Sequence, residues 1–300
     1  LNAGENFNKF EINKFVKAES EEKRQRGWRP FQLAFLLMNI NSIPRGDAFS
    51  KEENNTIDLI WFPTGGGKTE AYLGLAAFSM IYSRLLNPNL INTEIIMRYT
   101  LRLLTAQQFE RANCLILSLE YLRFNGLLGE KLKSSPVPFS SGLWVGKSLT
   151  PNRIDDASIK LKYLKSNNRK GKNVFLVLDC PWCKSSLTEG GYRGYQNIEK
   201  DIGFYCQNDQ CDFANKKLPI TVIDEQLYKN PPTLLLGTID KFAQLAWSSK
   251  GGVFFGKNEK SLPPSLIIQD ELHLITGPLG TIAANYEILI ELIIRHHNKE

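Results

Sequence analysis

A run of three glycines followed by lysine and threonine is the first feature of this sequence with a clear chemistry. It lies in the stretch LIWFPTGGGKTE, residues 59–70. Glycines reach backbone angles that other residues avoid, and main-chain N–H groups can then converge on an anion. The start of a helix directly after such a turn adds partial positive charge. A phosphate group is therefore the predicted ligand, held by Thr64, Gly65, Gly66, Gly67, Lys68 and Thr69.

Lys68 and Thr69 have separate predicted tasks in a nucleotide site. The lysine ammonium reaches the β and γ phosphates, and the threonine hydroxyl ligates Mg²⁺. The general pattern G-x-x-x-x-G-K-[ST] has glycine where this chain has Phe62. A chance glycine loop is the alternative, and the strand and helix patterns on either side disfavour it.

Two Asp-Glu pairs compete for the acidic part of such a site. Asp224 and Glu225 lie in ITVIDEQL, and Asp270 and Glu271 lie in SLIIQDELHLI, each after an apolar run typical of a buried strand. In this chemistry the aspartate holds Mg²⁺ through its water shell, and the glutamate orients and deprotonates the attacking water. The alternative for Asp224 and Glu225 is a surface-exposed pair where the cysteine-rich segment rejoins the sheet.

Four cysteines form the second candidate site. Cys180 and Cys183 are spaced C-x2-C, Cys206 and Cys211 are spaced C-x4-C, and 22 residues separate the two pairs. Two short-spaced thiol pairs on turns predict a tetrahedral Zn²⁺ site in a ribbon-like module, with all four positions taken by protein ligands. Two disulfides are the alternative, and the reducing compartment expected for a nucleotide-hydrolysing chain disfavours them.

Alternating strands and helices must position these sites. We expect strands at residues 57–62, 94–99, 142–145, 233–237 and 266–269, and helices at residues 30–40, after Thr69 and at residues 103–124. This alternation predicts an α/β fold with a doubly wound parallel sheet. Residues 158–173 (SIKLKYLKSNNRKGKN) are expected to form a basic, polar break, more typical of a solvated loop than of a nucleic-acid contact.

Composition sets broad limits on the class of protein. The 300 residues are 42% hydrophobic and 23% charged, with a net charge of +6, which favours a polyanionic partner only weakly. The sequence has no apolar run near ~18 residues and no signal-peptide pattern. We therefore expect no membrane span and a cytoplasmic location. Because the sequence begins with Leu1, we expect a piece of a longer protein.

Several segments, in order, resemble the motifs of superfamily 2 helicases. They are GWRPFQ, PTGGGKTE, MRYTLRLLTAQQ, LLLGTIDKF and QDELH. Longer segments such as WFPTGGGKTEAYLGL and DELHLITGPLGT are similar to the helicase subunit of the DISARM phage-defence systems, the DrmA family. The resemblance favours Asp270 and Glu271 over the other acidic pair. It also implies that His273 links the nucleotide site to the opposing lobe or to nucleic acid.

The same resemblance implies roles for residues outside the phosphate loop. Arg29 and Gln32 correspond to the adenine-side motif, with Gln32 reading the adenine edge. A polar residue on an amphipathic helix is the alternative. Nucleic-acid backbone contacts are implied for Arg98, Thr100, Arg102, Thr238 and Lys241. Contacts of this kind carry no base code, so little sequence specificity is expected.

The sequence therefore predicts the first RecA-like lobe of an ATP-dependent nucleic-acid translocase or helicase, with ATP, Mg²⁺ and Zn²⁺ as cofactors. Expected partners are nucleic acid, DNA in a defence setting, and a protein subunit of a defence complex. We expect an arm at residues 1–27, the lobe at 28–150 and 221–300, and the basic linker and zinc insertion at 151–220. The second lobe is expected to be absent, which would leave this lobe weak or inactive alone. Alternatives are an ATP-switched interaction module, whose zinc domain docks a partner, and a P-loop enzyme acting on a small molecule.

Overall fold

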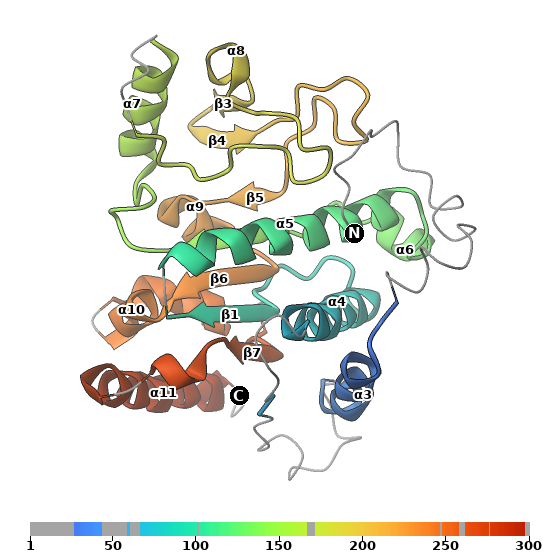
Figure 1. The fold of residues 1–300 in the computed structure, drawn as a ribbon, viewed down its shortest axis with the longest axis vertical. Coiled ribbons are helices and arrows are strands. Elements are labelled where there is room, and N and C mark those ends of the chain that lie inside the picture. Colours follow the sequence, from blue (N-terminus) through green and yellow to red (C-terminus); the bar gives the residue numbers. More distant parts are fainter. Residues whose placement is uncertain are drawn as a thin grey trace.

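A five-stranded parallel sheet is the centre of the fold (Figure 1). The computed structural model describes residues 27–43, 59–60, 67–100, 102–166, 172–246, 248–257, 262–275 and 277–297. The sheet has the order β5-β2-β6-β1-β7, and all four of its strand pairings are parallel. Its strands are β1 (Ile95–Tyr99), β2 (Ser141–Trp144), β5 (Ile220–Thr221), β6 (Leu234–Thr238) and β7 (Leu266–Gln269). The predicted parallel α/β sheet is confirmed, except that the strand expected at residues 57–62 lies mostly outside the described residues.

Helices cover both faces of this sheet, as alternate residues of β1 show. Ile95 and Met97 point into one hydrophobic cluster, which α4 (Lys68–Leu86) and α5 (Arg102–Phe124) complete. Ile96 points into a second cluster with α10 (Ile239–Phe242) and α11 (Gly277–His297). Because successive strand residues face opposite sides, a strand buried on both faces reads as a continuous apolar run. This is the doubly wound arrangement that the sequence predicts.

Short elements complete the lobe. Helix α3 (Pro30–Asn39) packs on α4. The other helical segments are η1 (Ile40–Ser42), α6 (Glu130–Lys133), α7 (Ile154–Lys165), α8 (Glu189–Tyr192), α9 (Asp224–Lys229), η3 (Ala243–Ala246), η4 (Ser249–Phe255) and η5 (Leu272–Leu274). Among the described residues, no helix combines the length and apolar character needed to cross a membrane.

The cysteine-containing segment forms a small module above the sheet in Figure 1. It contains a two-stranded antiparallel sheet of β3 (Tyr195–Ile198) and β4 (Asp201–Phe204). Its core is continuous with that of the lobe, because Trp182 stacks on Tyr121 of α5 with ring centroids 5.2 Å apart. Phe213 meets Phe124 edge to face at 5.5 Å. The module and the lobe therefore share a hydrophobic core through α5.

The expected basic break at residues 158–173 is wrong for its first half. Residues up to Lys165 continue helix α7, which begins at Ile154. Its buried face is made by Ala157, Leu161 and Leu164, at the i, i+4 and i+7 spacing of an amphipathic helix. Lysines occupy the other face, so the basic composition concealed the apolar periodicity. Residues 167–171 lie outside the described part of the chain.

Candidate nucleotide and metal sites

The end of the glycine run forms the start of α4. Gly67 has φ +89°, in the left-handed region that favours glycine, and Lys68 is the first residue of the helix. The main-chain carbonyl of Gly67 accepts a hydrogen bond of 2.8 Å from the Gln32 side chain. A Cβ at position 67 would lie 2.6 Å from that amide nitrogen. The conformation therefore favours glycine here, and a Cβ would also require the Gln32 side chain to shift, while Thr64, Gly65 and Gly66 lie outside the described residues.

Thr69 and Asp270 are joined through one tyrosine hydroxyl. Tyr72 Oη donates to Asp270 Oδ2 at 3.0 Å and lies 3.1 Å from Thr69 Oγ1. Burial, with the Asp270 charge as a smaller cause, raises the pKa of Tyr72 above its ordinary value, so the hydroxyl keeps its proton. Because Asp270 follows β7, the sheet brings the end of the phosphate loop to the carboxyl end of a strand. Tyr72 and Asp270, 198 positions apart in the sequence, are thus joined by one hydrogen bond.

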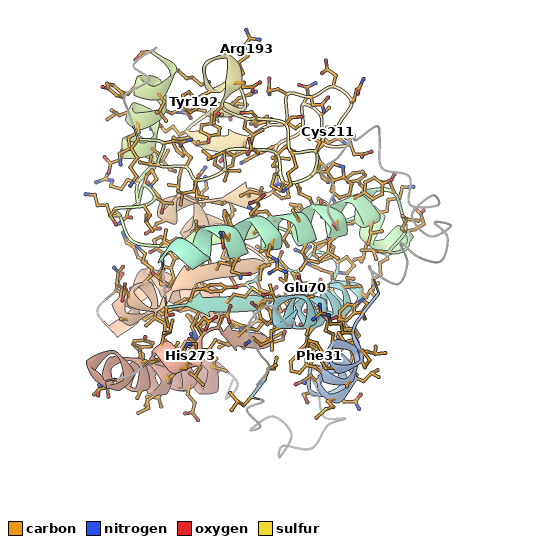
Figure 2. All side chains as sticks on the ribbon, viewed as in Figure 1. Phe31, Glu70, Tyr192, Arg193, Cys211 and His273 are labelled. Atoms are coloured by element: carbon orange, nitrogen blue, oxygen red, sulfur yellow. The ribbon has the colours of Figure 1, made fainter. Side chains whose placement is uncertain are left out.

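Main-chain contacts hold the Asp270 region in place. Asp270 N donates to Arg98 O at 3.0 Å, and Glu271 N donates to Asp270 Oδ1 at 2.9 Å. Glu271 has φ +50°, and its Oε2 lies 3.3 Å from His273 Nδ1. The His273 side chain is 71% exposed, and its label lies near α11 in Figure 2. The three predicted residues therefore form one turn at the sheet edge, with His273 facing solvent.

The competing acidic pair has a different setting. Asp224 is 2% exposed, and its Oδ2 accepts a hydrogen bond of 2.6 Å from Lys241 Nζ, so the expectation of a surface-exposed pair is wrong for this residue. Burial raises the pKa of Asp224, and the Lys241 charge opposes that shift. Glu225 is exposed and accepts from Ile154 N at 2.8 Å, where it caps α7. Asp224 follows β5, at the sheet edge opposite β7.

Three of the five residues predicted to contact nucleic acid have buried side chains. Arg98 is 6% exposed and forms an ion pair with Glu287 of α11. Thr238, at the end of β6, is 1% exposed, and Lys241, on α10, is 2% exposed. Thr100 is partly buried, and its hydroxyl has no hydrogen-bond partner among the described residues. The Arg102 side chain lies outside the described part of the structure.

Gln32 and Arg29 lie where α3 meets the phosphate loop. The Gln32 carboxamide is 5% exposed and engaged at both atoms. Its oxygen accepts from Arg29 N at 2.7 Å, and its nitrogen donates to Gly67 O. The structure therefore connects the adenine-side motif to the glycine turn, and reading of the adenine edge by Gln32 stays a prediction.

A cavity of about 560 Å³ lies beyond the carboxyl ends of β2 and β6. Its lining includes the exposed cations Lys147, Arg153 and Lys250, and also the acidic side chains of Asp156 and Glu225. Its floor includes the buried Asp224–Lys241 pair. The sequence did not single out these three cations, because the motif resemblance pointed to Thr238 and Lys241 instead.

The four predicted metal ligands come together in the module. All four Sγ atoms, from Cys180, Cys183, Cys206 and Cys211, lie within 4.8 Å of one another. Four sulfurs at about 2.3 Å from a tetrahedral Zn²⁺ would be about 3.8 Å apart, so the cluster fits such an ion. Hydrogen bonds within the cluster lower the pKa of Cys183 and Cys206, with Cys180 as the largest cause, and raise the pKa of Cys180 and Cys211. The arrangement is suited to a closed metal site without an open coordination position.

Cys114 is separate from this cluster. It lies on α5, partly buried, and its thiol donates to Pro181 O at 3.1 Å. Burial raises the pKa of the Cys114 thiol, so it has the character of a packing residue.

Tyr72 is the residue that sequence reasoning missed. Its signal was present, because Tyr72 follows Thr69 by three positions on a helix and must share its face. Tyr72 stands in an otherwise apolar helix, and the fold brings its hydroxyl to Asp270.

Comparison with known proteins gives one clear relative. No family model matches the chain. The chain is 38% identical over 332 aligned positions to "DISARM protein DrmA" of Bacillus paralicheniformis. The alignment covers 96% of this chain and 29% of that protein, so the chain spans less than a third of its relative's length. Along nearly its whole length, the chain is therefore related to the DISARM protein DrmA.

Proposed function

We propose that this chain is the ATP-binding first lobe of a superfamily 2 nucleic-acid translocase or helicase acting in phage defence. The observation that carries the proposal is the Thr69–Tyr72–Asp270 connection. Asp270 alone among the two candidate aspartates reaches the helix that follows the glycine run. Identity to DrmA along the chain supports the setting in a DISARM-like system. Because only part of that relative is matched, the activity belongs to the longer protein.

The chain's own residues would divide the work of ATP hydrolysis. Lys68 and the main-chain N–H groups at the start of α4 bind the phosphates, while Thr69 and Asp270 hold Mg²⁺. When bound, Mg²⁺ neutralises charge on the phosphate oxygens. The Glu271 main-chain N–H donates a hydrogen bond to the Asp270 carboxylate, which fixes the backbone there. The Glu271 side chain would orient the attacking water and accept its proton. Arg29 and Gln32 lie on the adenine side.

Nucleic acid would bind at the carboxyl ends of β2 and β6. The exposed cations Lys147, Arg153 and Lys250 line the cavity there beside Asp156 and Glu225, and the cations suit phosphate contacts without base readout. The buried Arg98, Thr238 and Lys241 would support this surface from beneath. Further proposed contacts follow the carboxyl ends of β1 and β7. They are Thr100 and Arg102, around the start of α5, and the exposed His273. DNA is the proposed substrate, as the resemblance of the motifs to phage-defence helicases implies.

The cysteine module would hold one structural Zn²⁺. The four converging thiols support zinc over disulfides, and the shared core with α5 supports a stabilising role. A cytoplasmic location and a partner subunit in a defence complex are part of the same proposal.

Nucleotide binding by a full-length protein containing this chain tests the proposal. Lys68→Ala removes one full charge from the phosphate cradle, so ATP binding measured by titration calorimetry should be lost. Lys131→Ala, an exposed lysine on α6, is the matched control and should bind ATP normally. Unchanged ATP affinity in Lys68→Ala would show that the glycine run does not hold phosphate.

A further inference from the structure

One buried hydroxyl stands between the two residues proposed to hold Mg²⁺. Tyr72 is 5% exposed, and its Oη contacts both Thr69 Oγ1 and Asp270 Oδ2. Burying a hydroxyl is unfavourable unless hydrogen bonds replace its water. Phenylalanine would fill the same space without that cost. Packing therefore explains the ring of Tyr72, and its two partners must explain the hydroxyl.

The position of this hydroxyl is fixed from both sides. The Tyr72 ring lies in the hydrophobic cluster with Ala76, Met80 and Tyr99, which anchors it to α4 and to β1. Strand β7 pairs with β1 in a parallel register, so the position of Asp270 relative to the end of β1 is fixed. The contact between α4 and β7 brings the two partners together.

Both carboxylate oxygens of Asp270 are thereby oriented. Oδ2 accepts from Tyr72, and Oδ1 accepts from Glu271 N. Mg²⁺ demands near-ideal octahedral geometry, so Thr69, as a direct ligand, and Asp270, acting through the water shell, would both need to be held in place. A ligand set held by supporting hydrogen bonds binds metal more tightly than one that must be ordered on binding.

We propose that Tyr72 is a positioning residue for the metal, whose hydroxyl sets the spacing and orientation of Thr69 and Asp270. The inference rests on the proposed nucleotide site and assigns a task to a residue outside its motifs. Tyr72 itself is not a metal ligand in this account. Its loss should weaken metal binding while leaving the phosphate cradle intact, because Lys68 and the helix N-terminus are unchanged.

The test uses Tyr72→Phe in the full-length protein, with Mn²⁺ as the metal probe. Mn²⁺ affinity in the presence of ADP is measured by electron paramagnetic resonance, and metal-free ADP affinity by calorimetry. We expect Mn²⁺ to bind about ten-fold more weakly, the scale of one hydrogen bond to a charged group. Metal-free ADP affinity should change less than about two-fold. Tyr228→Phe is the matched control. Tyr228 lies on α9, which contacts β2, and its hydroxyl accepts a hydrogen bond from Trp144 Nε1 on β2.

The outcomes separate the inference from the proposed function. Failure of the wild-type protein to bind ADP or Mn²⁺ defeats the nucleotide site itself. Wild-type binding with equal Mn²⁺ affinity in Tyr72→Phe overturns the inference alone. An equal loss in Tyr228→Phe, or a parallel loss of metal-free ADP affinity, also overturns it, because general loosening would then be the cause. A Tyr72→Phe variant that does not fold also overturns the inference, because the hydroxyl would then be needed for the fold itself.

Discussion

Lys241 Nζ donates a hydrogen bond of 2.6 Å to Asp224 Oδ2, and both side chains are almost completely buried. The pair ties the helix after β6 to the helix after β5, beneath the proposed nucleic-acid surface. Lys241 also lies 5.7 Å from the centroid of the Trp144 ring. Lys241 is therefore a structural cation that supports the surface rather than a group that meets phosphates directly.

Removing one member of this pair should destabilise the fold strongly. Lys241→Met leaves the Asp224 carboxylate buried and uncompensated, a change that costs about 3–5 kcal/mol of unfolding free energy. The double variant Lys241→Met/Asp224→Leu should recover most of that loss, because no charge remains buried. Urea denaturation measures both effects. Lys229→Met, on the exposed side of α9, is the control. A loss of unfolding free energy below about 1 kcal/mol in Lys241→Met would contradict the buried ion pair.

Metal removal should weaken the lobe as well as the module. The purified chain is expected to hold about one zinc ion, bound by the four clustered cysteines. Because Trp182 and Phe213 join the module to α5, Cys206→Ser or chelation should lower the thermal midpoint of the chain. Cys114→Ser, outside the cluster, should retain the metal. Elemental analysis without zinc, combined with disulfides in mass spectrometry, would refute the site.

Gly67→Ala should weaken nucleotide binding through two separate effects. A residue with Cβ is strained at φ +89°, by about 1–2 kcal/mol, and the added carbon meets the Gln32 amide. Gly191, in the cysteine module, has φ +81° and open space around its position, so the loss of unfolding free energy in Gly191→Ala measures the strain alone. ATP affinity by calorimetry is the measurement, and a normal value for Gly67→Ala would argue against this loop conformation.

The exposed cations at the cavity should set the salt dependence of nucleic-acid binding. Lys147→Ala and Lys250→Ala should each reduce the slope of log affinity against log salt by roughly one unit, equally for all sequences. Lys131→Ala on α6, which lies on the other side of the ribbon from α10 in Figure 1, should leave the slope unchanged. Binding isotherms at several salt concentrations distinguish these cases. A salt slope that changes in Lys131→Ala but not in Lys147→Ala would show that nucleic acid binds elsewhere on the protein.

The sheet was predictable because its signals are local. Strands such as residues 266–269 are apolar runs bounded by turn residues, and the structure places β7 at the same positions. The start of α4 at Lys68 follows from the glycine turn. Helix α7 was missed because its lysines dominate the composition of a segment whose apolar face has only three residues.

The site was predictable in its residue types but not in its burial. The spacing of the cysteines predicted their convergence, because short-spaced pairs have few other chemical uses. Motif resemblance led to Lys241 as a surface contact, and the structure pairs it with Asp224 in the core. Such a partner, 17 residues away and on another helix, depends on the tertiary fold. The same holds for Tyr72 and Asp270.

Steady-state ATP turnover by the full-length protein, with and without DNA or RNA, tests the central claim most directly. Turnover should rise when nucleic acid is added, independently of base sequence, and the rise should weaken steeply with salt. Glu271→Gln should nearly abolish it by removing the proton acceptor, whereas Glu225→Gln should leave it almost unchanged. A protein indifferent to every nucleic acid tested, or one silenced by Glu225→Gln but not by Glu271→Gln, would contradict the account.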